Sequence, residues 1–383
     1  MRLESLKFTE YEGTDQEWAL EGLSLGEKNL IVGKNASGKT RILNVINALA
    51  KYLAGLQAPS MSSNFDVKFS LDGKQLGYQM ISQDGQIIKE IFMEGNNILL
   101  DRAEGGEGTI WAEEEKKNIR FQTSPTRLAA VDKQDAIQHK FLEPLNSWGS
   151  SLRHYAFGTP LGKDHFPIFV EKGGAKFDER DSNVVVALFK QAVKEYDEAF
   201  KRKVIDDMSL VGYEIEEISM KPPVSIRISG MPGEIIGLCV KEKGLPGITD
   251  QHSMSQGMFR ALSVLIQINY SQMSKKATCI LIDDIGEGLD FERSCSLIDV
   301  LRKKADESSI QLIMSTNDRF VMNNVPLEEW SVLQRHGGRV QVRNYKNSKD
   351  VFDEFKFTGL SNFSFLELDF ISGSQSAEAL AHG

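Results

Sequence analysis

Residues 33–40 constrain the fold of this 383-residue chain more than any other segment, because they read Gly-Lys-Asn-Ala-Ser-Gly-Lys-Thr. This fits the pattern G-x-x-x-x-G-K-[ST] without deviation. A short apolar run, 30–32, precedes the segment, and apolar residues recur at helical spacing through 41–49. The glycines let the backbone curl so that successive N–H groups face an anion, and the following helix directs the positive end of its dipole at the same point. The sequence therefore predicts a phosphate-binding loop between a strand and a helix, with a chance match in an ordinary loop as the alternative.

The residues of this loop have distinct expected roles. Lys39 is expected to reach the β- and γ-phosphates of ATP, and Thr40 to offer its hydroxyl to Mg²⁺. ATP and Mg²⁺ are therefore the predicted ligands. The predicted nucleotide-binding residues lie in and just after the loop and are Gly33, Asn35, Ala36, Ser37, Gly38, Lys39, Thr40 and Arg41.

A second apolar run, 279–282, ends in two carboxylates, Asp283 and Asp284. A buried central strand of a parallel sheet has this pattern, and ligands of such sheets bind at the carboxyl ends of the strands. Asp283 is therefore predicted to hold Mg²⁺, directly or through water. Asp284 is predicted to orient the attacking water or to act as general base. The alternative is an ordinary buried strand followed by an acidic turn.

Residues 253–258 read Ser-Met-Ser-Gln-Gly-Met, at the start of a helix predicted over 256–272, and the apolar helix 259–270 follows them directly. A small polar residue and a glycine at a helix start form another anion-binding end. Such helix starts are common, so the interpretation depends on the position of this one, shortly before the Asp283 strand.

Taken together, these motifs resemble those of the ABC-type ATPase superfamily, in the branch that contains SMC, RecF and OLD-like proteins. The resemblance covers roughly residues 1–50 and 245–345, and the segment between them matches only in layout. It implies an α/β fold: a P-loop NTPase with an ABC/SMC-like head, a mixed sheet flanked by helices, an antiparallel β segment and a compact helical insertion. It also implies that Ser255, Gln256 and Gly257 form a signature motif. This motif would cap, in trans, the γ-phosphate of ATP held by a second subunit of a homodimer or higher homo-oligomer.

Two further segments match the family in order. Residues 288–290, Gly-Leu-Asp, resemble the D-loop, which lines the dimer seam and here contains Asp290. Residues 310–316 resemble the next core strand, which in the family leads to a switch histidine. Gln122, after a strand-rich stretch, is a candidate for the glutamine of the family's Q-loop, with a plain solvated glutamine as the alternative.

The chain departs from the family pattern at two catalytic positions. Asp284 occupies the place of the usual glutamate and is one methylene shorter. Asn317 occupies the place of the switch histidine; it can hydrogen-bond to the γ-phosphate or the water but cannot carry a proton. We therefore predict an ATPase, converting ATP and water to ADP and phosphate, with slow turnover and a long-lived ATP state.

The patterns divide the chain into four predicted parts. They are an N-terminal ATPase lobe with the P-loop and antiparallel strands (1–125), an insertion of helices and strands (126–240), a C-terminal ATPase lobe (241–372) and a flexible tail (373–383). Repeated turn signals predict β-hairpins over 66–122, and apolar periodicity predicts a helix over 183–208. Because no sustained heptads are present, we expect a compact insertion in place of a long coiled-coil arm.

The remaining elements follow from shorter patterns. Strands are expected at 1–10, 17–32, 210–240, 278–283, 310–315 and 331–345, helices at 126–155 and 292–304, and a loop at 157–175.

The composition excludes some classes of protein. The net charge of −9 argues against a bulk-basic DNA-binding module, although a local basic groove stays open as an alternative. The lysines and arginines of 190–203 are interspersed with acidic residues, which favours a solvated helix face over a nucleic-acid site. The N-terminus has no signal-peptide pattern and no apolar run is long enough to span a bilayer, so a cytoplasmic protein without a membrane partner is expected.

The cysteines and histidines suggest no metal site. Cys239, Cys279 and Cys295 form no CxxC pair, and the six histidines lack metal-binding spacing. Buried thiols in a reducing cytosol are the expectation.

The leading hypothesis is an ATPase that dimerises around ATP and regulates a separate effector, a nuclease or toxin, because no second set of catalytic motifs stands out. The chain resembles small ATPases of anti-phage systems of the Septu, PARIS and retron types, which implies a role in bacterial defence. The first alternative is a RecF-like ATPase that binds DNA in repair or recombination. A second is a scaffold that binds ATP and hardly hydrolyses it. A transporter subunit is a third alternative, for which the sequence shows no coupling-helix signal.

Overall fold

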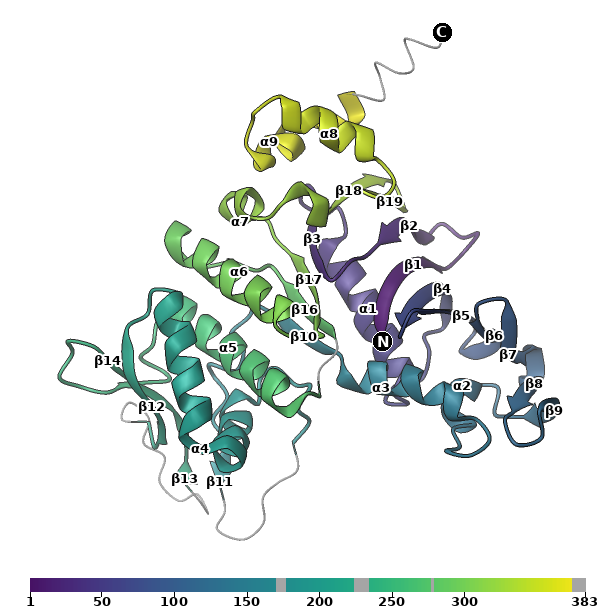
Figure 1. Cartoon of the computed structure of the whole chain (residues 1–383), viewed down its shortest axis with the longest axis horizontal. Helices are drawn as coiled ribbons and strands as arrows, with labels where there is room; N and C mark the ends of the chain where they lie inside the picture. The colour runs from purple at the N-terminus through teal and green to yellow at the C-terminus, as the bar shows by residue number, and fades with distance from the viewer. Residues whose placement is uncertain (170–176, 224–233, 277–278, 374–383) are drawn as a thin grey trace. The chain divides into compact units, whose positions relative to one another are not determined.

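The computed structural model describes residues 1–169, 177–223, 234–276 and 279–373 (Figure 1). The chain forms two compact units, and each is described here by itself. The first unit comprises Met1–Leu152, Gln311–Asn317 and Val325–Gly383, and the second comprises Arg153–Ile310 and Asp318–Asn324. The domain boundaries expected after residues 125, 240 and 372 remain predictions. The expected tail lies, beyond its first residue, outside the described residues.

The first unit is built on a large mixed sheet with the strand order β17-β3-β18-β19-β2-β1-β4-β5-β6-β7-β8-β9. Its strands, in chain order, are β1 (Arg2–Glu10), β2 (Trp18–Ser24), β3 (Lys28–Val32), β4 (Ser62–Leu71), β5 (Lys74–Gln83), β6 (Gln86–Glu94), β7 (Asn97–Arg102), β8 (Glu107–Ala112), β9 (Lys117–Gln122), β17 (Gln311–Ser315), β18 (Trp330–His336) and β19 (Arg339–Asn344). β3 runs parallel to both β17 and β18. From β2 to β9 all neighbours are antiparallel. The predicted mixed α/β fold is therefore confirmed.

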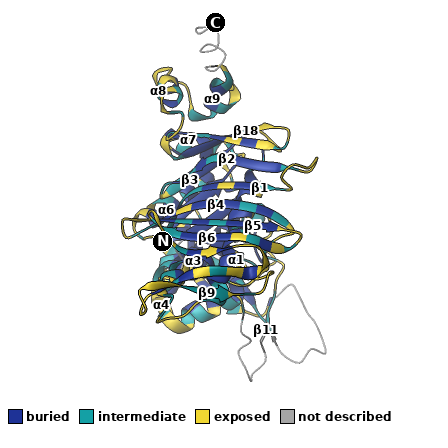
Figure 2. Ribbon diagram, turned by 90° about the vertical axis from the view of Figure 1, so that its right-hand side faces the viewer, coloured by how far each residue is buried: buried dark blue, intermediate teal, exposed yellow. Residues whose placement is uncertain are grey.

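The β4–β9 meander confirms the hairpins expected over 66–122. Asp72 and Asp84 have positive φ angles (49° and 51°), and the glycine after each has one too. Two consecutive left-handed residues match the right-handed twist of the flanking strands, which is why Asp-Gly turns suit two-residue hairpins. Side chains along β5 alternate between buried and more exposed, and Figure 2 shows the buried residues along β4 and β5.

The helices of the first unit are α1 (Lys39–Leu53), α2 (Ala129–Asp132), α3 (Glu143–Ser151), α8 (Lys349–Phe357) and α9 (Asn362–Glu367), with 3-10 turns η1 (Glu104–Gly106), η2 (Lys140–Leu142) and η3 (Leu327–Glu329). The sequence predicted that residues 126–155 are mainly helical, and this prediction is only partly right. Asp135 accepts hydrogen bonds from the backbone N–H groups of Ile137 and Gln138 (both 2.7 Å), and this local bonding favours a turn over a continued helix. α8 and α9, which the sequence analysis did not predict, bury Phe352, Phe355 and Phe365 together.

The second unit contains the parallel pair β10 (Arg153–Ala156) and β16 (Cys279–Asp283). It also contains a small antiparallel sheet, β12 (Ile215–Lys221), β14 (Gly237–Glu242) and β15 (Thr249–Asp250), and the short pair β11 (Ile168–Phe169) and β13 (Glu234–Ile235). Its helices are α4 (Val185–Leu210), α5 (Gln256–Ser274), α6 (Phe291–Asp306) and α7 (Arg319–Asn324).

A buried polar cluster joins three helices of the second unit. The Lys304 ammonium on α6 donates to the Asp207 carboxylate on α4 (2.6 Å) and to the Asn269 side-chain oxygen on α5 (2.8 Å). Because a buried charge is tolerated only when it is paired, this cluster fixes how the helices pack. α4 is the helix expected at 183–208, and it is interrupted at Asp197, whose φ is 49°.

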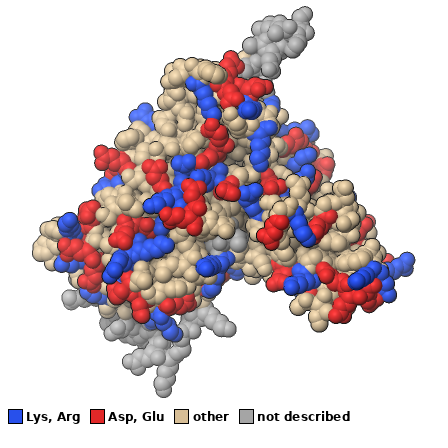
Figure 3. All heavy atoms as spheres, viewed as in Figure 1, with Lys and Arg blue, Asp and Glu red and all other residues tan. Residues whose placement is uncertain are grey.

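The sequence also led to predictions about membrane-spanning helices, surface charge and the burial of the cysteines. Among the helices in the described part of the chain, we find none with the length and apolar character needed to cross a membrane. On the face drawn in Figure 3, basic and acidic side chains are interspersed. Cys239 and Cys279 are buried thiols, as expected, and Cys295 is partly exposed.

One side chain fixes the core strands of the first unit. Gln311, at the start of β17, is 2% exposed. Its amide nitrogen donates to the carbonyls of Leu3 (2.7 Å) and Gly26 (2.8 Å), and its oxygen accepts the N–H of Leu3 (3.1 Å). Gln311 thereby ties β17 to β1 and to the turn before β3.

We predict that Gln311→Ala lowers the free energy of unfolding by about 2–4 kcal/mol, since the N–H and carbonyl of buried Leu3 and the Gly26 carbonyl each lose a hydrogen bond. Urea denaturation measures the change. Gln341→Ala on β19, where the side chain is exposed, is the matched control and should stay within about 0.5 kcal/mol of wild type. Equal effects of the two substitutions would contradict the role assigned to Gln311.

Candidate nucleotide-binding site

The predicted phosphate-binding loop, residues 33–40, lies between β3 and α1 in the first unit (Figure 1). Its lysine, Lys39, is 6% exposed, and its ammonium donates to the carbonyls of Gly33 (2.9 Å) and Lys34 (3.4 Å). Gly38, with a φ of 108°, adopts a conformation that side chains with a Cβ rarely reach. The loop therefore curls around the ammonium of its own lysine.

Three features of this loop fit a polyphosphate. Among the described residues, no side chain caps the N-terminus of α1, and its first turn holds no acidic residue, so the positive end of the helix dipole is directed at the loop. The Ser37 hydroxyl is buried and, among the described residues, finds no hydrogen-bond partner. A buried hydroxyl in this state is suited to an oxygen-rich ligand. Thr40 is exposed on the first turn of α1, so its hydroxyl is accessible to a metal ion.

Asn317 emerges at the same edge of the first unit's sheet. β17 pairs in parallel with β3, with Ser315 opposite Ile31, and the Thr316 N–H bonds to the Ile31 carbonyl (3.4 Å). Asn317 is exposed and follows directly. The carboxyl ends of both strands thus bring Asn317 and the loop to one edge, as expected for parallel neighbours.

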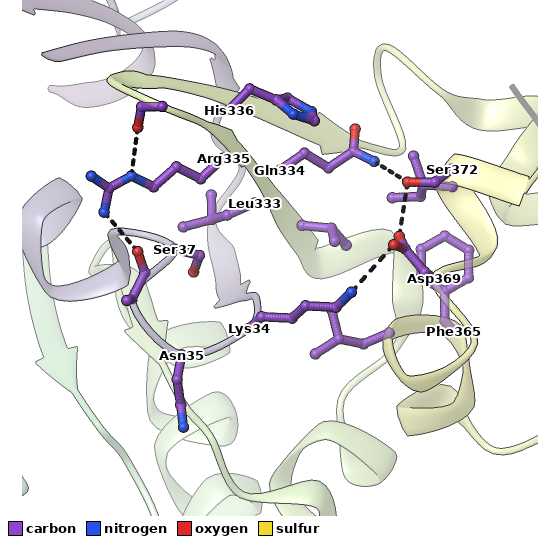
Figure 4. A pocket seen from close by; sticks show the side chains of 15 residues that line it. Lys34, Asn35, Ser37, Leu333, Gln334, Arg335, His336, Phe365, Asp369 and Ser372 are labelled. Carbon is purple, nitrogen blue, oxygen red and sulfur yellow. Dashed lines mark hydrogen bonds and ion pairs between the residues drawn. The ribbon is translucent and has the colours of Figure 1, made fainter.

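A cavity of about 570 Å³ lies beside the loop, and Figure 4 shows its lining. It is bounded by the loop, by the end of β18 and by the segment after α9. The Arg335 guanidinium donates to the Ala36 carbonyl (2.8 Å), and Lys34 pairs with Asp369 (3.3 Å). Sequence analysis did not find Arg335 or Asp369, because neither belongs to a local motif.

Arg41, the last predicted nucleotide-binding residue, lies on α1 and pairs with Glu10. Its guanidinium also covers the ring of Trp18, 4.3 Å from the ring centroid. Arg41 therefore joins α1 to the ends of β1 and β2. Gln122 lies on β9, at the far end of the strand order from β3, and is exposed, which favours the alternative of a solvated glutamine.

The paired carboxylates lie at the end of β16 in the second unit. Asp283 is 6% exposed, and its carbonyl accepts the N–H of Phe157, just after the parallel neighbour β10 (2.9 Å). Asp284 has a φ of 54°, a left-handed conformation that aspartate tolerates better than most residues. A Cβ built on Gly158 would lie 3.5 Å from the Asp284 Cβ, so the segment after β10 runs beside the carboxylates.

The signature segment opens α5 in the same unit. Ser255 is exposed and caps the helix by accepting the Met258 N–H (3.2 Å). Gln256 is half-buried and begins the helix, and Gly257 is buried. A Cβ on Gly257 would lie 2.7 Å from the Gly288 carbonyl oxygen, so only glycine allows this approach to the D-loop.

Arg260, one turn into α5, is a residue that sequence analysis missed. Its guanidinium is 8% exposed and donates to the carbonyls of Gly158 (2.7 Å), Thr159 (2.9 Å) and Glu287 (2.9 Å). It thereby links α5 to the segment after β10 and to the residue directly before the predicted D-loop. A charged residue in a helix whose neighbours are nearly all apolar is the signal that could have identified it.

Asp290 caps α6. Its carboxylate accepts the Arg293 backbone N–H (3.0 Å), and this bond holds the pKa of the carboxyl below its usual value. The Arg293 guanidinium pairs with the same carboxylate and covers the Tyr213 ring. The second unit thus brings together the signature segment, the D-loop and the two carboxylates. The P-loop, Thr40 and Asn317 belong to the first unit.

The comparisons with known proteins concern the fold. No protein-family model matches the sequence, and no curated protein does. A solved SMC head bound to the C-winged-helix domain of ScpA is similar with a TM-score of 0.53 and 12% identity, over 90% of this chain and 97% of that one. The SMC head with an extended coiled coil derived from Pyrococcus furiosus, bound to the C-terminal domain of ScpA, gives 0.49 and 12%, over 93% and 99%. The SMC head from Thermotoga maritima gives 0.44 and 15%, over 90% and 99%. The first of these similarities supports the conclusion that the chain has the fold of an SMC head, as predicted.

We predict that Gly257→Ala destabilises the protein by about 1–3 kcal/mol, because the new methyl group overlaps the Gly288 carbonyl and forces the D-loop away. Thermal or urea denaturation measures the loss, and hydrogen exchange over 284–290 locates it. The control is Gly247→Ala, since a Cβ there meets nothing within 4 Å. If Gly257→Ala were as stable as the control, with unchanged exchange, the close approach would be wrong.

Proposed function

We propose that this chain is a cytoplasmic ATPase that binds ATP with Mg²⁺ at the P-loop and hydrolyses it slowly. The observation that carries the proposal is the loop itself. A complete G-x-x-x-x-G-K-T segment curls between β3 and an uncapped helix, with Lys39 buried in it and the Ser37 hydroxyl unpartnered among the described residues. The similarity of the fold to an SMC head supports the same conclusion.

The proposed roles follow from the chemistry of each side chain. Lys39 binds the β- and γ-phosphates. Thr40 and Asp283 would hold Mg²⁺, which supplies positive charge to the phosphate oxygens. Asp284 orients the attacking water and accepts its proton, and Asn317 hydrogen-bonds to the γ-phosphate or the water. Turnover is slow because the Asn317 amide cannot take up or release a proton and because Asp284 is one methylene shorter than the glutamate usual in the family.

We further propose that two chains close around two ATP molecules, with Ser255, Gln256 and Gly257 of one chain facing ATP held by the other. The Ser255 cap is compatible with this role, since a hydroxyl that accepts one hydrogen bond still has its proton to donate to a phosphate. Asp290 belongs to the D-loop at the proposed seam. Its bonds to Arg293 support the conformation of that segment.

The ATP-driven closure is proposed to regulate a separate effector protein, a nuclease or toxin, in bacterial anti-phage defence. The support is a single recognisable set of catalytic motifs in the sequence, together with an SMC head of similar fold that is bound to a domain of another protein, ScpA. If the purified chain alone cut nucleic acid in the presence of ATP, a separate effector would not be needed and this part would be wrong.

The test combines ATP hydrolysis with mass in solution, with and without MgATP. Wild type should become a dimer with ATP and turn over slowly. Asp284→Ala should lower turnover by about 10²–10⁴-fold while retaining the ATP-bound dimer, because it loses the general base and keeps the phosphate site. Lys39→Ala should lose both ATP binding and the dimer.

Asp206→Ala, an exposed aspartate on α4, controls for the loss of one negative charge and should behave as wild type. An unchanged mass for all four proteins would overturn the composite site. Equal ATP binding by wild type and Lys39→Ala would overturn the P-loop assignment.

A further inference from the structure

The Ala36–Ser37 peptide of the phosphate-binding loop is held from both sides. Its carbonyl accepts the Arg335 guanidinium (2.8 Å), and its N–H donates to the Lys34 carbonyl (3.1 Å). Because a peptide unit is planar, two hydrogen bonds at its opposite edges fix its rotation about the chain. One of these bonds is local to the loop, and the other comes from a strand 299 residues away.

This peptide follows a strained residue. Ala36 has a φ of 62°, in the left-handed region that a residue with a Cβ disfavours. The conformation persists only where the surroundings determine it. The bond from Arg335 comes from outside the loop and is made to the carbonyl of this residue.

Arg335 is itself well placed to act as a rigid support. It lies near the end of β18, and its Nε donates to the Gly337 carbonyl in the turn before β19 (2.9 Å). His336 and Arg339 pair directly across that turn. The two bonds of the guanidinium, one to the turn and one to the loop, are visible together in Figure 4.

We propose that Arg335 is a positioning residue for the phosphate-binding loop: it holds the left-handed conformation at Ala36 and so orients the backbone of the loop for phosphate. The inference rests on the proposed function, because the ligand in question is ATP. It adds a residue that belongs to none of the nucleotide-binding motifs. Since Arg335 is exposed, its substitution should leave folding intact.

The test titrates each variant with a fluorescent ATP analogue in the presence of Mg²⁺. Arg335→Ala should weaken binding about 3- to 10-fold, the effect of one net hydrogen bond. Arg335→Lys should weaken it similarly, because a single ammonium cannot reproduce the two diverging donors of the guanidinium. Arg339→Ala removes the same charge from the same hairpin, where it pairs with Glu17, and should change binding less than about 2-fold.

A second substitution separates geometry from charge. Ala36→Gly removes the penalty for positive φ, so in the Arg335→Ala background it should recover most of the lost affinity. Measured against Ala36→Gly alone, the two changes should be non-additive. A purely electrostatic role would give the reverse pattern: Arg335→Lys would retain the affinity for the ATP analogue, and Ala36→Gly would not restore it in the Arg335→Ala background. That pattern would overturn the proposal.

Hydrogen exchange without nucleotide tests the positioning directly. The amides of 33–41 should exchange faster in Arg335→Ala than in wild type or Arg339→Ala. Unchanged exchange together with unchanged affinity would overturn the inference while leaving ATP binding intact. A wild-type protein that binds no ATP would overturn the proposed function, and the inference with it.

Discussion

The parallel alignment of β3 with β17 and β18 is the constraint on which the first unit depends. Parallel neighbours end at the same edge, so three chain segments that are far apart in sequence leave the sheet together. β3 continues into the predicted phosphate-binding loop, β17 leads to Asn317, and β18 carries Arg335 near its end. Gln311 secures this alignment from the opposite ends of the strands, through bonds to Leu3 and Gly26.

Left-handed backbone conformations occur at many points of the described chain, and three of them lie where these chemical groups are presented. Gly38 and Ala36 shape the phosphate-binding loop, and Asp284 turns the chain after β16. Such conformations cost free energy and persist where neighbouring contacts determine them. Each has an identifiable support: Gly38 lacks the Cβ that would be strained, Ala36 is held by Arg335, and aspartate tolerates the left-handed region. At these three positions the left-handed residue belongs to a turn that places a loop or a carboxylate.

The sequence predicted those features whose cause is local. The strand–loop–helix around residues 33–40, the hairpin turn at Asp72 and the strand that ends in Asp283 each depend on residues close together in the chain. Gln311 and Arg335 could not be found in the same way, because their partners are 308 and 299 residues distant and no periodicity records such a pairing. The turn at Asp135 was missed for a different reason: its carboxylate competes with the backbone hydrogen bonds of a helix, and apolar spacing does not register that competition.

The residue types of the predicted signature segment, residues 255–257, can be explained in two ways that do not exclude each other. Within one chain, Ser255 is a helix cap, Gly257 permits a close approach to Gly288, and Asp290 caps the next helix. These local roles alone would account for the residue types. The cap does not compete with a role toward ATP of a second chain, since it uses the oxygen of the serine and leaves its proton to donate. A helix start that is well capped and closely packed is rigid, and rigidity is what a surface needs if it is to recognise a phosphate that another subunit presents.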